Sequence, residues 1–279
     1  MLYNLAGKVA VVTGGGGVLC RTMVMALAAQ GAKVAVLDLE EELAQQVADD
    51  IKAAGGVAIA VACNVLEVNS LREAHRKVRQ NLGSCDILIN GAGINHPKGT
   101  TSHTHLLSDD LEVTEGIKTF FDLDPEGIKF VFDLNFIGSL LPTQVFAKDM
   151  VGREGGSIIN ISSMNAFRPL TKIPAYSGAK AAVSNFTQWL AVHFAKVNIR
   201  VNALAPGFFL TEQNRALLTT ADGSLTDRGN TILSHTPMGR FGSPDDLAGT
   251  LLWLCSDASA FVTGVVVPID GGFSAFSGV

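Results

Sequence analysis

The chain of 279 residues has little cysteine, few aromatic side chains and no long hydrophobic run. Its four cysteines, Cys20, Cys63, Cys85 and Cys255, are far apart and have no CxxC or Cys/His spacing that suits zinc. This favours buried, reduced thiols, and we expect no metal. No apolar run reaches the roughly 20 residues that span a bilayer, and the N-terminus lacks a signal peptide's basic start and apolar core. We therefore expect a cytoplasmic protein.

Charge of one sign is also not concentrated anywhere along the chain. Lys and Arg total 21 against 26 Asp and Glu, and the net charge of -5 is spread out. This disfavours nucleic acid and anionic membranes as partners. Hydrophobic residues make up 47% of the chain, which is enough to form the core of one large domain covering 1–279.

Short β-branched apolar runs alternate with longer segments of helical periodicity. Strands that are apolar throughout are buried on both faces, which predicts a parallel sheet with helices above and below it. The sequence therefore predicts an α/β fold, a Rossmann-like doubly wound parallel sheet in a single domain. The predicted strands are 9–12, 34–37, 58–61, 87–89, 158–161 and 201–204.

Two polar stretches interrupt this alternation. Residues 95–125 follow the fourth strand, are rich in Thr, Ser, His and Asp, and are too long for an ordinary connection, so they form a predicted insertion. Residues 208–237 follow the sixth strand, at the edge where open α/β sheets bind ligands. We expect this second stretch to be a lid over the substrate.

Four consecutive glycines follow the first strand and lead into a helix. Glycines let the backbone turn tightly and bring its N–H groups, together with the positive end of the helix, against a pyrophosphate. A flexible turn without a ligand would have the same composition. The expected phosphate-binding residues are Gly14, Gly16, Gly17, Val18 and Leu19.

Asp38 ends the second strand, about 20 residues beyond the glycines, where an acidic side chain can accept hydrogen bonds from the adenosine ribose. A carboxylate there would repel the extra phosphate of NADP, and neither Leu39 nor Glu40 compensates for it. We therefore expect NAD, with NADP the less favoured cofactor. The alternative is that Asp38 only caps a helix.

Tyr176 and Lys180 are four residues apart in a segment of good helix formers, so both side chains project from one helix face. A nearby cation lowers the pKa of a phenol toward the range useful for proton transfer. Ser163 ends the preceding strand, where its hydroxyl can hold a substrate oxygen against Tyr176. Ser162 should point the opposite way. A surface Tyr and Lys that share a face by chance is the alternative.

The combined pattern resembles the short-chain dehydrogenase/reductase family over nearly the whole chain outside the insertion. That resemblance implies that Tyr176 is the general acid/base, that Ser163 polarises the carbonyl, that Lys180 tunes the tyrosine and binds the nicotinamide ribose, and that Asn135 holds a water in the proton relay. It also implies a homotetramer formed through helices at about 128–150 and 175–196. Further implied cofactor-binding residues are Asn64, Val65, Asn90, Gly91, Ala92, Pro206 and Gly207.

The glycine loop departs from the family pattern. The family usually has glycine at the positions of Val18 and Cys20, with Gly17 here one place early. Asn64 replaces a common Asp, and Gly91 replaces the second Asn of an Asn-Asn-Ala-Gly segment. These departures concern details of the loop and leave the expected cofactor unchanged.

Three segments, 119–124, 141–150 and 270–279, resemble the D-mannonate oxidoreductase (fructuronate reductase) branch of that family. The resemblance implies a sugar-acid substrate, most simply D-fructuronate/D-mannonate, for which a cation and several hydrogen-bonding groups are needed. Gluconate 5-dehydrogenase-like or other polyol dehydrogenases are alternatives, and a non-catalytic NAD-binding regulator is a remote one. The candidate substrate residues are Asn95, Asn165, Arg168 and Arg215, with Arg168 first.

Overall fold

The computed structural model describes residues 3–112, 116–211 and 214–278. Within these residues the strands form one parallel sheet of seven, in the order β3-β2-β1-β4-β5-β6-β7. The order reverses between β1 and β4, which creates a crevice at the carboxyl ends of these two strands. The strands are β1 Val9–Thr13, β2 Lys33–Asp38, β3 Val57–Ala62, β4 Ile87–Asn90, β5 Gly156–Ile161, β6 Ile199–Pro206 and β7 Val266–Ile269.

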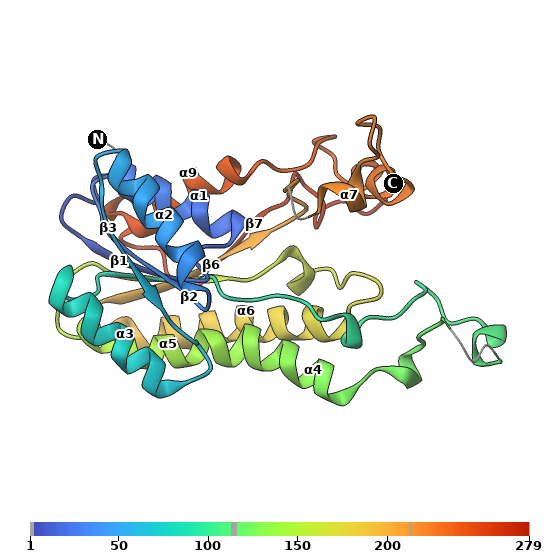
Figure 1. Cartoon of the computed structure of the whole chain (residues 1–279), viewed down its shortest axis with the longest axis horizontal. Helices are drawn as coiled ribbons and strands as arrows, with labels where there is room; N and C mark the ends of the chain where they lie inside the picture. Colours follow the sequence, from blue (N-terminus) through green and yellow to red (C-terminus); the bar gives the residue numbers. More distant parts are fainter. Residues whose placement is uncertain (1–2, 113–115, 212–213, 279) are drawn as a thin grey trace.

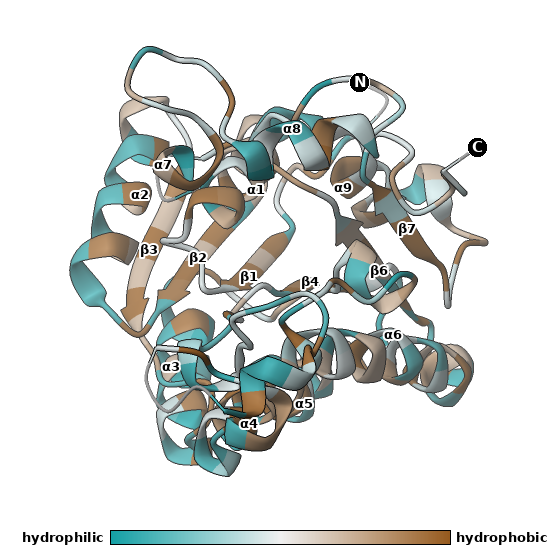
Figure 2. Cartoon of the chain, turned by 90° about the vertical axis from the view of Figure 1, so that its right-hand side faces the viewer, coloured by the Kyte–Doolittle hydropathy of each residue, from teal (hydrophilic) through white to brown (hydrophobic). Residues whose placement is uncertain are grey.

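Helices cover both faces of the sheet, as the sequence predicts (Figure 1). On one face lie α1 Val18–Ala29, α2 Glu41–Ala53 and α9 Ala248–Cys255; on the other lie α3 Val68–Asn81, α5 Gly138–Phe146 and α6 Pro174–Phe194. Each face of the sheet has its own hydrophobic core, and alternate residues of β1 belong to one or the other, because successive side chains point to opposite faces. Ala10 packs with the first group of helices, whereas Val11 packs with the second. Figure 2 shows the apolar strands enclosed between helices whose outer faces are more hydrophilic.

The predicted helix at 128–150 consists of four consecutive helical segments, the last of them a 3₁₀ turn at Ala147–Asp149. The segment α4 Pro125–Phe132 passes through a π-helix at Asp133–Ile137 into α5. Asp124 caps α4 by accepting a hydrogen bond from the Glu126 N–H at 2.8 Å, so the insertion ends there. By length and apolar content alone Pro125–Asp149 could cross a membrane, but α4 and α5 pack on α6 and α3, as core helices do.

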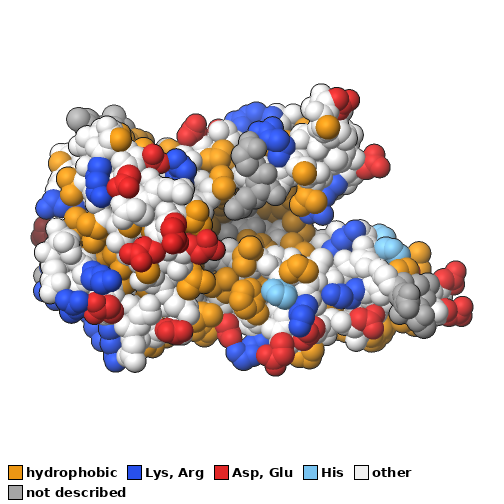
Figure 3. Space-filling model, in the orientation of Figure 1, with side chains coloured by type: hydrophobic (Ala, Val, Ile, Leu, Met, Phe, Trp, Pro, Cys, Tyr) orange, Lys and Arg blue, Asp and Glu red, His pale blue; other side chains and the backbone are white. Residues whose placement is uncertain are grey.

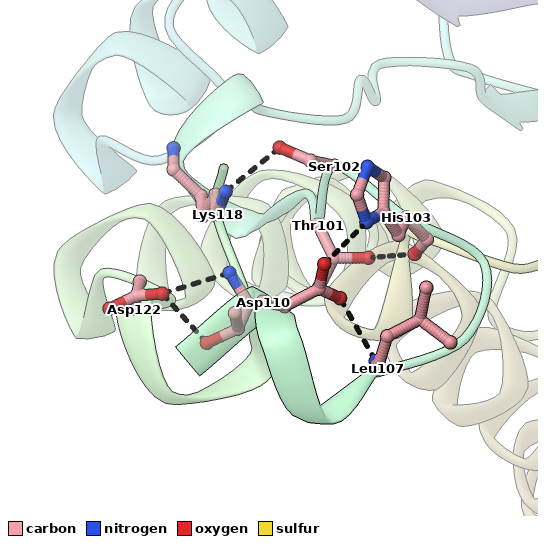
Figure 4. Close-up of polar contacts among 8 residues, drawn as sticks. Thr101, Ser102, His103, Leu107, Asp110, Lys118 and Asp122 are labelled. Carbon is pink, nitrogen blue, oxygen red and sulfur yellow. Dashed lines mark hydrogen bonds and ion pairs between the residues drawn. The ribbon is translucent and has the colours of Figure 1, made fainter. Parts of the chain in front are cut away.

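The stretch predicted as an insertion, 95–125, extends in its described part from the body as an arm below the mouth of the molecule (Figure 1). It has three short 3₁₀ turns, Pro97–Gly99, Ser108–Leu111 and Phe120–Asp122, held by local polar contacts. His103 Nδ1 lies 3.0 Å from Asp110 Oδ1, and the Lys118 N–H donates to Ser102 Oγ at 2.8 Å (Figure 4). Over the described ranges, no group of three His, Cys, Asp or Glu side chains could hold a metal ion.

The stretch predicted as a lid, 208–237, lies across the mouth from the arm (Figure 1). In its described part it contains two short helices, α7 Arg215–Leu218 and α8 Asp227–Ser234. Residues 113–115 of the insertion and 212–213 of this stretch lie outside the described residues. The space-filling view shows a deep hollow between the upper and lower parts of the molecule (Figure 3).

Candidate active site

A cleft of about 470 Å³ lies at the carboxyl ends of the central strands. It is lined by residues of the glycine loop, the segment after β4, the end of β5, helix α6 and the start of the stretch after β6. This is the edge of an open α/β sheet where ligands bind. Of the predicted site residues, those that line it are Gly14, Gly17, Val18, Leu19, Asp38, Gly91, Ala92, Ser163, Tyr176, Lys180, Pro206 and Gly207.

The glycine loop is shaped to receive an anion at the start of α1. Gly14 has φ +62°, and a Cβ there would come within 2.9 Å of the Ala92 Cα. Gly17 is the N-cap residue of α1 and supplies no side-chain cap. The first N–H groups of the helix are therefore left for a ligand, and the helix dipole favours a negative one. This arrangement fits the pyrophosphate of a dinucleotide.

Asp38 is fixed at the end of β2 by backbone contacts. Its Oδ2 accepts a hydrogen bond from the Gly16 N–H at 2.9 Å, and its Oδ1 accepts one from Glu40 N–H at 3.3 Å. The carboxylate thus joins the glycine loop to the β2 edge of the cleft and keeps lone pairs for ribose hydroxyls. The Glu41 and Glu42 carboxylates in the first turn of α2 add negative charge nearby.

Two asparagines predicted to bind the cofactor have structural contacts. Asn90 is buried, and its Nδ2 donates to Thr143 Oγ1 at 2.9 Å and to Asn160 Oδ1 at 2.8 Å. Asn64 follows Cys63, whose N–H donates to the Asp38 carbonyl. The Asn64 side chain donates a hydrogen bond to Glu67 and accepts one from the Leu66 N–H. Asn64, Val65 and Asn90 are not among the cleft-lining residues.

Ser163 and Tyr176 both line the cleft, and the Ser163 side chain is near enough to act on the pKa of Tyr176, which it lowers. Ser163 is the N-cap of the 3₁₀ turn after β5, and Tyr176 lies in the first turn of α6. The Ser162 hydroxyl instead contacts Ser184 Oγ at 2.7 Å and the Lys180 carbonyl at 3.2 Å. The Ser162 hydroxyl is thus occupied by these contacts, whereas Ser163 and Tyr176 both line the part of the cleft where a carbonyl or carbinol oxygen can be bound.

Lys180 lies one turn beyond Tyr176, with its Nζ 5.5 Å from the centre of the tyrosine ring. The ammonium group is buried and donates to the Ile161 carbonyl at 2.7 Å. Burial lowers the pKa of Lys180 to about 8. Burial raises the pKa of Tyr176 to about 12, and the interaction with Ser163 acts against this rise. Desolvation is the larger influence on Tyr176, and Lys180 is not among the causes of its pKa shift, so the lowering of this pKa by Lys180 stays a prediction.

Asn135 lies in the π-helix between α4 and α5 and is completely buried. Its Nδ2 donates to the carbonyls of Ile94 and Val131, whereas its Oδ1 has no hydrogen-bond partner among the described residues. A Cβ on Gly93 would lie 2.5 Å from this Oδ1 and 3.1 Å from Lys180 Nζ. Asn135 thus lies behind the cleft, next to Lys180, although it does not line it.

The four candidate substrate residues are not in the lining of the cleft. Asn95 Nδ2 donates to Thr100 Oγ1, and the Oδ1 atoms of Asn95 and Asn165 are buried with no hydrogen-bond partner in the part of the chain that the structure describes. Arg168 is exposed on the loop between Ser163 and Tyr176, and its Nε donates to the Ser274 carbonyl at 3.2 Å. Arg215 begins α7.

Several cleft residues were not found by sequence reasoning. Thr13 supports the cleft from beneath without lining it: its buried Oγ1 accepts hydrogen bonds from the N–H groups of Gly91 and Ala92 and so joins β1 to the segment after β4. A hydroxyl directly before the glycines was the available signal for it. The other residues that line the cleft include Cys20, Met23, Leu43, Gly93, Ile94, Phe208, Phe209, Thr211 and Asn214.

Comparisons with known proteins identify the family of the chain. The sequence profile described as enoyl-(acyl carrier protein) reductase matches residues 18–274. An uncharacterized oxidoreductase of Haemophilus influenzae is 58% identical over 278 residues, covering 99% of this chain and 96% of the relative. The chain therefore belongs to the short-chain dehydrogenase/reductase family of oxidoreductases, which act on CH–OH groups.

Two solved structures bear on the cofactor and the substrate. A Haemophilus protein described as a proposed D-mannonate oxidoreductase, with bound NAD, matches with a TM-score of 0.95 and 58% identity, covering 99% of this chain and 98% of that one. A gluconate 5-dehydrogenase from Burkholderia cenocepacia, in complex with NADP and tartrate, matches with a TM-score of 0.82 and 31% identity, covering 98% of both chains.

Proposed function

We propose that this chain is an NAD(H)-dependent oxidoreductase that interconverts D-fructuronate and D-mannonate. The observation that carries the reaction type is the convergence of the Ser163 and Tyr176 hydroxyls beside buried Lys180, in a cleft whose other end has an open helix N-terminus. The sugar-acid substrate is supported by the resemblance to the Haemophilus protein described as a proposed D-mannonate oxidoreductase.

The residues of the chain would divide the work as follows. When bound, NAD(H) supplies or accepts the hydride, and Gly14, Gly17 and the start of α1 hold its phosphates. Ser163 donates a hydrogen bond to the substrate oxygen, and Tyr176 gives that oxygen a proton during reduction or removes one during oxidation. Lys180 and Asn135 complete the proton path behind the tyrosine.

The preference for NAD over NADP follows from charge at the adenosine end. The Asp38 carboxylate is held against the glycine loop by the Gly16 N–H. A 2′-phosphate there would face Asp38 together with Glu41 and Glu42 of the first turn of α2. Repulsion between like charges in a partly enclosed site would weaken NADPH binding.

A gluconate 5-dehydrogenase-like activity is the second candidate, because a 31% identical relative of that activity was solved with NADP and tartrate. A non-catalytic NAD-binding regulator is disfavoured, since simple binding does not need a serine–tyrosine pair next to a buried lysine. We further propose a homotetramer in the cytoplasm. Trp189 and Val192 are exposed on α6, and the Trp189 ring stacks on Phe186 and His193. This exposed apolar face supports burial of the helix against another copy of the chain.

The experiment is NADH oxidation by the purified protein with D-fructuronate, alongside 5-keto-D-gluconate and an acetoacetyl thioester, each repeated with NADPH. Turnover of D-fructuronate with NADH, reduced by about 10²- to 10⁴-fold in Tyr176→Phe, is the expected result. Faster turnover of 5-keto-D-gluconate would show that the proposed substrate is wrong, whereas the proposed roles of Ser163 and Tyr176 would still hold. NADH binding without turnover of any compound would overturn the enzymatic proposal.

A further inference from the structure

Three segments that are far apart in the sequence meet beside the mouth of the cleft. They are the loop 164–173 between Ser163 and α6, the start of the stretch after β6, and a compact turn at 270–276, which we call the 270–276 turn. Its Phe273 ring packs edge-on against Phe208, with centroids 5.3 Å apart, and the Met238 N–H donates to the Gly271 carbonyl. The turn is thus attached to the lid side of the cleft.

The 270–276 turn is held rigidly by one carboxylate. Asp270 Oδ1 accepts a hydrogen bond from the Gly272 N–H, and its Oδ2 accepts from the N–H and Oγ of Ser274. These bonds fix the Ser274 peptide, whose carbonyl accepts the hydrogen bond from Arg168 Nε at 3.2 Å. The guanidinium of Arg168 is therefore oriented from a distant part of the chain.

This contact leaves the binding end of Arg168 available. Nε is one of five N–H donors, and the two terminal amino groups have no hydrogen bond or ion pair with any described residue. Because the guanidinium is planar, fixing Nε also fixes the plane of the two terminal groups, which can grip a carboxylate through parallel bonds.

The loop that carries Arg168 is attached at its other end as well. The Thr101 N–H of the arm donates to the Lys172 carbonyl at 2.9 Å, and Lys172 has φ +71°. A non-glycine residue in the left-handed region is held there by its surroundings and marks a constrained segment. The arm and the 270–276 turn thus fix the loop 164–173 from both sides.

Other cations around the mouth already have partners. Lys98 Nζ lies 2.9 Å from Asp124, whose hydrogen bond raises the pKa of the lysine, and Arg240 forms a two-point contact with Asp246. Lys118 Nζ donates to the Pro97 carbonyl. Arg168 differs from Lys98 and Arg240, because its contact with a carbonyl orients it without neutralising its charge.

We infer that Arg168, positioned by the carbonyl of Ser274, binds the carboxylate of the substrate and makes the enzyme select acids over neutral sugars. This inference rests on the proposed function and names the residue that would make it specific. Arg168 acts on the end of the substrate away from Ser163 and Tyr176. Its loss should therefore weaken binding of the acid and leave the chemistry at the other end intact.

The test separates charge recognition from turnover. The enzyme–NADH complex is titrated with D-mannonate and with D-mannitol, its uncharged counterpart, and binding is followed by NADH fluorescence. We expect Arg168→Gln to bind D-mannonate about 10- to 100-fold more weakly, with D-mannitol binding unchanged, because a charge-assisted pair is lost. Arg168→Lys should recover only part of the loss. Arg72→Gln, which changes an exposed arginine on α3, is the matched control and should bind as the wild type does.

The role of the turn is tested by Asp270→Ala, which removes the acceptor that fixes Ser274. It should weaken D-mannonate binding in the same direction, and the double variant with Arg168→Gln should lose no more than Arg168→Gln alone. Equal binding of D-mannonate by Arg168→Gln and wild type, or no preference of the wild type for D-mannonate over D-mannitol, would overturn the inference. Because binding needs no turnover, failure to reduce D-fructuronate would count only against the proposed reaction.

Discussion

The thiol of Cys20 occupies the space that the Cβ of any side chain at residue 91 would need. Cys20 lies in the first turn of α1, and Gly91 follows β4 across the cleft. The two positions are also two of those at which this chain departs from the usual pattern of its family, with cysteine in place of glycine and glycine in place of asparagine. The glycine at residue 91 thus leaves the space that the Cys20 thiol fills.

This pairing predicts a rescue between two substitutions. Gly91→Ala alone should lower stability and NADH affinity, since its Cβ meets the Cys20 thiol and the Thr13 carbonyl. Cys20→Gly should be tolerated better, and adding it to Gly91→Ala should restore part of the loss. Thermal unfolding and NADH titration measure both effects. Strictly additive losses in the double variant would show that the two residues are not coupled.

A second prediction concerns the glycine that faces Asn135 and Lys180. Gly93→Ala would place a methyl group 2.5 Å from Asn135 Oδ1 and 3.1 Å from Lys180 Nζ, so one of these side chains must move. We expect kcat to fall about tenfold or more with a smaller change in KM, because the proton path is disturbed while the cleft remains open. Ala92→Gly, at the neighbouring position, is the control. Unchanged kcat in Gly93→Ala would argue against a role for this packing.

The electrostatics of Asp38 predict a change of cofactor preference. Asp38→Ser removes the carboxylate but keeps an acceptor for the Gly16 N–H. The ratio of kcat/KM for NADPH to that for NADH should rise by about tenfold or more, since a repulsive charge is lost. Asp50→Ser, on the outer part of α2, controls for the change in net charge. A ratio equal to that of the wild type would exclude Asp38 as the selecting group.

Lys180 predicts an unusual dependence of stability on pH. Its pKa falls from the usual 10.5 to about 8 on folding because the ammonium is desolvated. Between these values the Lys180 side chain binds more protons in the unfolded chain than in the folded one, so its own contribution to the free energy of unfolding should rise with pH from about 8 to 10.5 by an amount on the order of a few kcal/mol. The four buried cysteines, whose pKa burial raises from 9.0, act in the opposite direction above about pH 9, so the Lys180 contribution is read from the difference between the wild type and Lys180→Met.

Urea unfolding of the cofactor-free protein at several pH values measures this effect. Lys180→Met should be more stable than the wild type near pH 7, and the difference should shrink as the pH rises, since the wild type no longer buries a charge. Curves that stay parallel for the two proteins would contradict the lowered pKa of Lys180. Tyr176, with its pKa raised to about 12, acts in the opposite direction only above pH 10.

The features predicted correctly from sequence are those with a local pattern. Tyr176 and Lys180 could be placed on one helix face from their spacing, and the alternation of apolar runs gave the doubly wound sheet. β7 was not predicted, because its residues are only partly buried and include Pro268. The break at Asp133–Ile137 was also missed, since a π-helix has the same composition as the helices beside it.

Contacts between distant segments could not be predicted. The hydrogen bond from Arg168 to Ser274 joins residues 106 positions apart, and the side chain of Asn90 is used by Thr143 and Asn160 inside the fold. Asn135 appeared as an ordinary helix residue, and only the approach of Gly93 and Lys180 gives it a special environment. Such relationships depend on packing, which a periodic pattern does not encode.

The interior position of β1 in the sheet also affects how the chain must fold. This strand pairs with β2 on one side and with β4, more than 70 residues later, on the other, and each ladder in the sheet is parallel. Every strand pair therefore requires closure of a long loop before its hydrogen bonds form, which makes folding slow. Until β4 arrives, one edge of the apolar strand β1 is open to other chains. We expect refolding to be sensitive to protein concentration, with aggregation competing with completion of the sheet.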